Sequence, residues 1–261
     1  MVAVTSADGP VAVTGAAGYI GAHVCLNLVQ HGYTVRACVR DKSRADKTDH
    51  LLAMNVPDAA GQLELHEADM LDKGSYDEIF AGCSCIFHIA ADLGHDVGGL
   101  TKAAGQPVGL GGIDLYNSIV DSTRNVLDSI EQSGSVTRLV YTSSGAAIKG
   151  PHPKGHVFTE EDWCGAGGLP KKFGKSHTNE KNPYGKGKMD CELMCYEWGR
   201  EQGIDVMSCI PEHALGPLLC KAHDTTFQHD LGATFCGAKN ASFAPFYTRN
   251  DHFTKTGSGQ T

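Results

Sequence analysis

The sequence predicts an α/β fold with a doubly wound, mostly parallel sheet, and two observations carry this prediction. Short apolar runs of strand length alternate along the chain with longer stretches in which apolar residues recur at helical spacing. A glycine-rich turn separates the first apolar run from the first helical stretch. Alternation of this kind buries a parallel sheet under helices on both faces.

The first strand–helix–strand unit occupies the start of the chain. Val11 to Thr14 is an apolar run of strand length, and Gly15 to Gly21 is the glycine-rich turn. Apolar residues then recur at helical spacing from Tyr19 to His31, and Gly32 follows as a helix stop. Thr34 to Val39 alternates as a strand does, which completes a unit of the expected length.

The same alternation predicts the later elements. We expect loops in the glycine-rich stretches 92–112 and 149–183, and we find no internal repeat. Residues 1–216 are expected to form the main domain, and 217–261, with weak periodicity, a short C-terminal substrate lobe or tail. Further strands are expected at Leu63 to Glu67, Cys85 to Ala90, Val136 to Thr142 and Asp205 to Ile210, and helices at Tyr76 to Phe80, Asp114 to Gln132 and Pro183 to Gln202.

Composition excludes several classes of partner. The 261 residues carry a formal net charge of −8, which argues against nucleic acid or an anionic membrane surface as the main partner. No apolar run approaches the roughly 18 residues of a membrane helix, and the N-terminus does not read as a secretory leader. The ten cysteines are scattered through expected strands and helices, so we expect reduced thiols and a cytosolic protein. Their spacing and that of the histidines predict no metal site.

The glycine-rich turn predicts a phosphate-binding loop. Gly15 would make the sharp bend, Gly18 would let the backbone approach a pyrophosphate, and Gly21 would let helix and strand pack closely. The N-terminus of the following helix presents N–H groups and a partial positive charge to the phosphates. A Rossmann-type nucleotide-binding domain is therefore expected.

The end of the second strand indicates NADP as the cofactor. NAD-preferring proteins commonly place a carboxylate at this strand tip, where this chain has Val39 followed by Arg40. The planar guanidinium of Arg40 suits a 2′-phosphate, and Lys47 adds positive charge nearby. Asp41 leaves NAD open as an alternative. Asp69, after the third strand, is placed either to contact the adenine or to cap the next helix.

Tyr184 and Lys188 form the candidate catalytic pair. Four residues apart on a helix, they share one face. A free tyrosine has a pKa of about 10, and a neighbouring ammonium stabilises the phenolate, which eases proton exchange. Ser144, preferred to Ser143, comes just after a buried strand. The carboxyl-terminal ends of parallel strands form the edge of the sheet where ligands bind, so Ser144 is expected to orient a substrate carbonyl.

With these residues in view, the chain resembles the extended short-chain dehydrogenase/reductases, and within them the dihydroflavonol reductase, cinnamoyl-CoA reductase and aldehyde reductase branch. The likeness rests on VTGAAGYIG, YTVRACVRD, VYTSSGAA and NPYGKGK and covers roughly residues 10–217. It implies a catalytic triad of Ser144, Tyr184 and Lys188. It further implies cofactor contacts from Gly15, Gly18, Tyr19, Ile20, Gly21, Arg40, Lys47, Asp69, Met70, Ala90, Ala91, Tyr184, Lys188, Pro211 and His213.

The expected function is NADPH-dependent reduction of an aldehyde or ketone, a small-molecule carbonyl substrate, by a monomer or homodimer. Two alternatives stay open. One is a non-catalytic NADP-binding subunit of a larger complex, which the few residues after Pro217 suggest; the other is a sugar-nucleotide epimerase or dehydratase on the same fold. His213 would either act near the nicotinamide or pack against the small lobe. Residues 217–261 show little of the family pattern, so the resemblance does not carry over a substrate.

Overall fold

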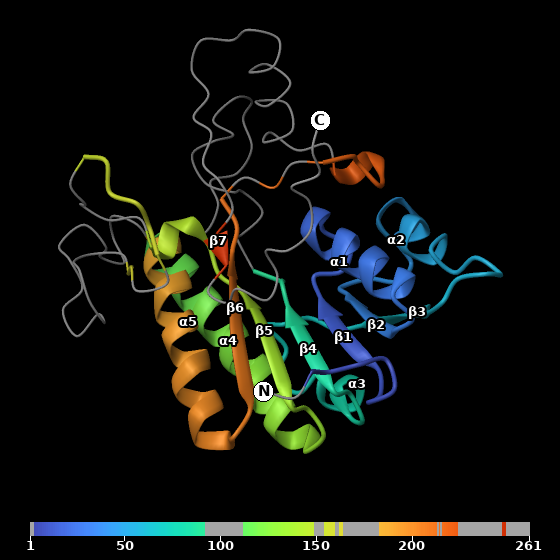
Figure 1. Cartoon of the computed structure of the whole chain (residues 1–261), viewed down its shortest axis with the longest axis horizontal. Helices are drawn as coiled ribbons and strands as arrows, with labels where there is room; N and C mark the ends of the chain where they lie inside the picture. The colour runs from blue at the N-terminus through green and yellow to red at the C-terminus, as the bar shows by residue number, and fades with distance from the viewer. Residues whose placement is uncertain are drawn as a thin grey trace, which may run out of the picture.

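The computed structural model describes residues 3–91, 112–148, 154–159, 162–163, 183–212, 214, 216–223 and 247–248. Its strands form one sheet in the order β3-β2-β1-β4-β5-β6-β7 (Figure 1). All neighbouring strands pair in parallel except β6 and β7, which are antiparallel. The bounds are β1 (Val11–Thr14), β2 (Thr34–Val39), β3 (Gln62–Glu67), β4 (Cys85–His88), β5 (Arg138–Thr142), β6 (Asp205–Ile210) and β7 (Tyr247–Thr248).

Helices cover both faces of this sheet. The α-helices are α1 (Tyr19–Gln30), α2 (Ala45–Leu52), α3 (Asp77–Phe80), α4 (Gly112–Ser133) and α5 (Pro183–Gln202), and the 3₁₀ helices are η1 (Gly145–Ala147) and η2 (Lys221–His223). Successive side chains of β1 point to opposite faces of the sheet. Val11 and Val13 pack with α1 and α2, whereas Ala12 packs with α4 and α5. Because side chains alternate across a strand, one short run of apolar residues serves two cores.

Most of the expected elements are confirmed. The predicted fold class, a Rossmann-type α/β sheet, is confirmed by the order of the parallel strands. The helix stop after α1 is also confirmed, since Gly32 has a φ of 86°, a conformation that glycine adopts without strain. The sequence analysis missed α2, because Ala45–Leu52 is mostly polar and reads as a basic surface loop. In the structure Thr48 and Leu51 are its buried residues.

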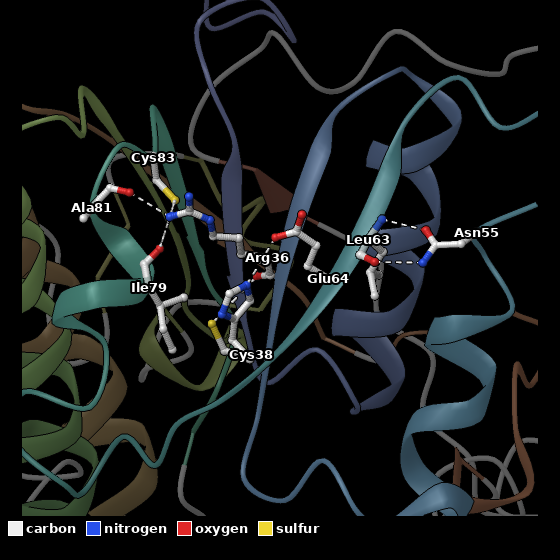
Figure 2. Close-up of polar contacts among 9 residues, drawn as sticks. Arg36, Cys38, Asn55, Leu63, Glu64, Ile79, Ala81 and Cys83 are labelled. Atoms are coloured by element: carbon white, nitrogen blue, oxygen red, sulfur yellow. Dashed lines mark hydrogen bonds and ion pairs between the residues drawn. The ribbon is translucent and has the colours of Figure 1, made fainter.

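Two side chains fix the edge of the sheet at β2 and β3 (Figure 2). Arg36 reaches from β2 past the end of α3, where its Nη1 donates to the carbonyl oxygens of Ile79 at 2.6 Å and Ala81 at 2.7 Å. Asn55 makes a two-point contact with the backbone of Leu63, its amide donating at 2.8 Å and its carbonyl oxygen accepting at 2.7 Å. The first set of bonds joins β2 to the end of α3, and the second joins β3 to the segment that follows α2.

The helices α4 and α5 lie side by side on their face of the sheet (Figure 1). A Cβ at Gly187 would lie 3.2 Å from two carbon atoms of Ile119, so the two helices approach closely at this point. Ile119, Val126 and Ile130 of α4 are buried in the chain's own core. The close contact between Gly187 and Ile119 therefore helps to position the start of α5 against α4.

The described part of the C-terminal region contacts the main domain. Leu219 packs with the core on the α1 side, and β7 pairs with β6 at the edge of the sheet. The division into 1–216 and a lobe of 217–261 stays a prediction, since most of the second range lies outside the described residues.

Candidate functional site

The glycine-rich turn has the close contacts that a phosphate loop requires. A Cβ at Gly21 would lie 2.2 Å from the carbonyl oxygen of Gly15, and one at Gly15 would lie 2.9 Å from the Cα of Ala90. Gly15 also has a φ of 67°. Only glycine fits at these two positions, because a side chain would overlap backbone atoms. Gly18 is the N-cap of α1 and has no side chain to cover the helix end.

Thr14 holds this loop against the end of β4. Its hydroxyl accepts hydrogen bonds from the backbone N–H groups of Ile89 and Ala90, both at 3.1 Å. Ala90 and Ala91 were expected to pass the cofactor, and the structure places Ala90 directly beside Gly15. The sequence analysis missed the role of Thr14, which is fully buried. A polar residue at the end of an otherwise apolar strand was the available signal.

Arg40 and Lys47, the expected 2′-phosphate contacts, are both exposed. Arg40 directly follows β2, and Lys47 lies in the first turn of α2. Within the part of the chain that the structure describes, neither makes an ion pair with a carboxylate. The neighbouring Arg44, by contrast, binds both carboxylate oxygens of Asp46 at 2.8 Å. Arg40 thus presents an exposed cation at the tip of β2, and Lys47 presents another on α2.

Asp69 and Met70 follow β3 and have different surroundings. Asp69 is exposed, and its carboxylate accepts from the backbone N–H of Leu71 at 2.9 Å, so the side chain stabilises its own turn. Met70 is buried in the core beneath α4, where its carbonyl accepts from Asn125 at 3.0 Å. Tyr19 and Ile20, at the start of α1, are both partly buried. The cofactor contacts of all four stay predictions.

Lys188 is a buried cation at the carboxyl-terminal end of β5. Its side chain is in the interior, with 3% of the residue exposed, and its Nζ donates to the carbonyl oxygen of Thr142 at 2.8 Å. The same Nζ lies 5.2 Å from the centre of the Tyr141 ring. Tyr184 lies one turn earlier on α5 and is partly buried against the core that α4 and α5 share.

The structure gives the two adjacent serines different environments. Ser143 donates to the buried carboxylate of Glu192 at 2.6 Å, and its backbone N–H donates to Cys209 at 2.8 Å. Ser144 is only partly buried and begins η1, where its hydroxyl accepts from the backbone N–H of Ala146 at 3.2 Å. The helix η1 that follows Ser144 packs against α5, where Ala147 is buried with Met189. Ser143 therefore has a structural role, which favours Ser144 for contact with a ligand.

The segment after β6 adjoins the same edge. The carbonyl of Pro211 accepts from the backbone N–H of Gly145 at 3.1 Å. The side chain of Glu212 packs so closely against Gly145 that a Cβ there would overlap its carboxylate. His213 lies outside the described residues. Pro211 is thus joined to the turn that follows Ser144, and its contact with the nicotinamide stays a prediction.

These residues fit a dinucleotide. A side chain at Gly15 or Gly21 would overlap backbone atoms of the loop, the exposed Arg40 follows β2, and the ammonium of Lys188 is buried at the carboxyl-terminal end of β5. Sheets of this kind bind ligands at that edge. A search of the described helices finds none with the length and apolar character needed to cross a membrane.

Comparisons with known proteins agree with this fold. Bifunctional dihydroflavonol 4-reductase/flavanone 4-reductase of Pyrus communis is 32% identical over 213 residues, 80% of this chain and 55% of that protein. Cinnamoyl-CoA reductase CAD2 of Medicago truncatula is 33% identical over 217 residues, 80% of this chain and 59% of that protein. The crystal structure of Gre2 from Candida albicans in complex with NADPH matches with a TM-score of 0.58 and 26% identity, over 80% of this chain and 59% of that one.

The chain spans a little over half the length of the curated relatives it matches. The expected resemblance to the dihydroflavonol reductase and cinnamoyl-CoA reductase branch of the extended short-chain dehydrogenase/reductases is confirmed. A family model matches residues 11–241, beyond Pro217, where the sequence analysis ended its resemblance. The chain therefore belongs to the NAD dependent epimerase/dehydratase family.

Proposed function

We propose that this protein is an NADPH-dependent reductase that converts an aldehyde or ketone to an alcohol. The observation that carries the proposal is the position of Lys188. Its ammonium is buried against the carbonyl of Thr142, two residues before Ser144 and one helical turn from Tyr184. A lysine is rarely buried unless its ammonium is paired with another group. Lys188 is buried at the edge of the sheet where such folds bind ligands.

The cofactor would be held by residues that follow β1 and β2. Gly15, Gly18 and Gly21 leave room for the pyrophosphate, and Arg40 with Lys47 would bind the 2′-phosphate. The NADPH bound to Gre2 supports NADP over NAD. Bound NADPH supplies a hydride to the carbonyl carbon.

The chain's own residues would supply the proton and the orientation. Ser144 would donate a hydrogen bond to the carbonyl oxygen, and Tyr184 would give that oxygen its proton. Lys188 would stabilise the phenolate left behind and bind the ribose of the cofactor. The three groups divide the work between polarising the substrate, transferring a proton and holding the charge that results.

The relatives guide the remaining parts of the proposal. Their names describe reductases of dihydroflavonols, flavanones and cinnamoyl-CoA, all small molecules with a carbonyl group, which supports a substrate of that class. The eight described cysteines are free thiols, which supports a reducing location such as the cytosol. We propose a monomer or homodimer.

The test is oxidation of NADPH by the purified protein with a panel of aldehydes and ketones. We expect turnover with at least one carbonyl compound and its loss by about 10²-fold or more in Tyr184→Phe. Tyr196→Phe, on the same helix, is the matched control and should retain activity. Absence of turnover in the presence of tight NADPH binding would instead support the non-catalytic subunit.

An epimerase or dehydratase of a sugar nucleotide is the second candidate, favoured by the description of the matching family model. Such a protein would be expected to retain NAD through purification and to convert a sugar nucleotide without net oxidation of NADPH. Release of the nucleotide from the denatured protein, followed by its identification, separates the two candidates.

A further inference from the structure

Three potential metal ligands from distant parts of the chain meet beside the phosphate loop. His50 belongs to α2, while Cys220 and His223 belong to the segment that follows β6. One ligand atom from each lies within 4.8 Å of the other two. The rings of His50 and His223 stand nearly perpendicular, with centroids 4.8 Å apart. Cys220 and His223 are three residues apart, but His50 lies 170 positions before Cys220, so residue spacing alone did not reveal the cluster.

The hydrogen bonds of His223 leave one nitrogen suited to a metal. Its Nε2 lies 3.1 Å from the carbonyl oxygen of Ala17, so this nitrogen carries the proton and donates it. Nδ1 then has a lone pair, and it is buried with no hydrogen-bond partner among the described residues. Histidines that bind metals commonly donate their other N–H to a backbone carbonyl in this way, which fixes the ring.

His50 has two ring nitrogens without a hydrogen-bond partner among the described residues, whereas His223 has one. Both ring nitrogens of His50 are buried. Leaving a buried polar group unsatisfied is unfavourable, so such groups often mark an unseen water or ion. Burial is the main cause that lowers the pKa of both His50 and His223, which favours the neutral imidazole. Neutral imidazole is the form that binds metals.

We propose that His50, Cys220 and His223 form a binding site for a divalent transition metal, with Zn²⁺ as the favoured ion. A set of two imidazoles and one thiolate suits zinc, which binds nitrogen at about 2.0–2.1 Å and sulfur at about 2.3 Å. Tetrahedral zinc would bring these ligand atoms to roughly 3.5 Å from one another. Rotations of the Cys220 and His50 side chains, which are only partly buried, would bring their ligand atoms toward His223.

A metal at this position would link two parts of the structure. The ion would join α2 to the segment 216–223, and through His223 it would also hold Ala17 of the phosphate loop. The ring of Tyr19 packs edge-on against His223, with centroids 5.7 Å apart, so the start of α1 adjoins the same cluster. Metal binding would therefore stabilise the packing of this segment on the nucleotide-binding domain.

Cobalt substitution tests the site on the full chain. The reduced, metal-free protein is titrated with Co²⁺, whose bonds to thiolate sulfur give a near-ultraviolet charge-transfer band. We expect one equivalent of Co²⁺ to produce this band, Zn²⁺ to remove it by competition, and Zn²⁺ to raise the melting temperature by several degrees. Cys220→Ser should lose the band, and His50→Ala and His223→Ala should weaken Co²⁺ binding by at least tenfold.

Two control variants make the result specific. Cys209→Ser removes another partly buried thiol, and His31→Gln removes an exposed histidine that is bound to its own helix through Asn27. Both should keep the cobalt band. Without metal, the site variants should melt at nearly the same temperature as the wild type. Only the rise in melting temperature on addition of Zn²⁺ should then be lost in these variants. A wild-type protein without the band, or an equal band in Cys220→Ser, would overturn the site.

Discussion

The hydroxyl of Thr14 and Nδ1 of His88 lie 2.9 Å apart in the interior of the sheet. Because that hydroxyl already accepts two backbone N–H groups from the end of β4, its own proton is directed at the histidine. His88 is therefore the acceptor at Nδ1 and is neutral. Burial, with the ammonium of Lys188 as a smaller cause, lowers the pKa of His88 to about 3 from an ordinary value of 6.5.

This low pKa predicts acid sensitivity of the fold. Between pH 6.5 and about pH 3 the unfolded chain binds a proton at position 88 and the native chain does not. The contribution of His88 to stability is thus complete above pH 6.5 and is lost as the pH falls, by roughly 1 kcal/mol per pH unit. Urea unfolding at pH 7 and at pH 5 measures it. His88→Asn, which does not titrate, should show a smaller difference between the two pH values, and an unchanged difference would contradict the assignment.

Two glycines of the phosphate loop should respond differently to alanine. In Gly21→Ala the new Cβ would meet the carbonyl oxygen of Gly15 at 2.2 Å, and we expect a loss of about 3 kcal/mol in the free energy of unfolding. In Gly18→Ala the nearest such contact is 3.3 Å, so the fold should be retained. NADPH affinity should fall in Gly18→Ala, because its methyl group would stand where the pyrophosphate binds. Denaturant unfolding and fluorescence titration with NADPH measure the two effects.

The exposed cations at the tip of β2 should decide between the two cofactors. Arg40→Ala and Lys47→Ala should each weaken NADPH binding by about 10- to 100-fold, the effect of losing a charged hydrogen bond, and leave NADH binding unchanged. Arg44→Ala is the matched control, because Arg44 already binds Asp46. Equal losses for NADPH and NADH would show that these residues do not read the 2′-phosphate.

The two adjacent serines should separate catalysis from stability. Ser143→Ala deprives the buried Glu192 of a hydrogen bond, and the free energy of unfolding should fall by about 1–3 kcal/mol. Ser144→Ala should cost about 1 kcal/mol or less, since it removes only the acceptor for Ala146 at the start of η1. Its kcat should fall by about 10²-fold or more, because the carbonyl loses its hydrogen-bond donor. The reverse pattern would assign the catalytic role to Ser143.

Local patterns predicted most of the framework but not all of it. The strands from β1 to β6 were visible because each is an apolar or alternating segment of strand length, bounded by turns or helices. The helix α2 was missed because Ala45–Leu52 has a largely polar sequence and is held by the burial of Thr48 and Leu51. The pairing of β7 with β6 was also missed, since a two-residue strand has no periodicity to detect.

The candidate site shows the same division. The glycine spacing and the Tyr184–Lys188 pair depend on residues close together in the chain, where backbone sterics and helical periodicity fix the geometry. The bond from Ser143 to Glu192 could not be predicted, because 49 positions separate the partners. The preference for Ser144 over Ser143 came from the sequence, and this bond supports it.

The sequence by itself determined the α/β class, the phosphate loop and the helical pairing of a tyrosine with a lysine, since each follows from neighbours in the chain. Only the tertiary structure decided that Thr14 fixes the end of β4 and that His50 meets Cys220 and His223. Such contacts depend on the order of the strands and on the packing of segments far apart in the chain. Their physical cause is the joint burial of these side chains, which no local pattern records.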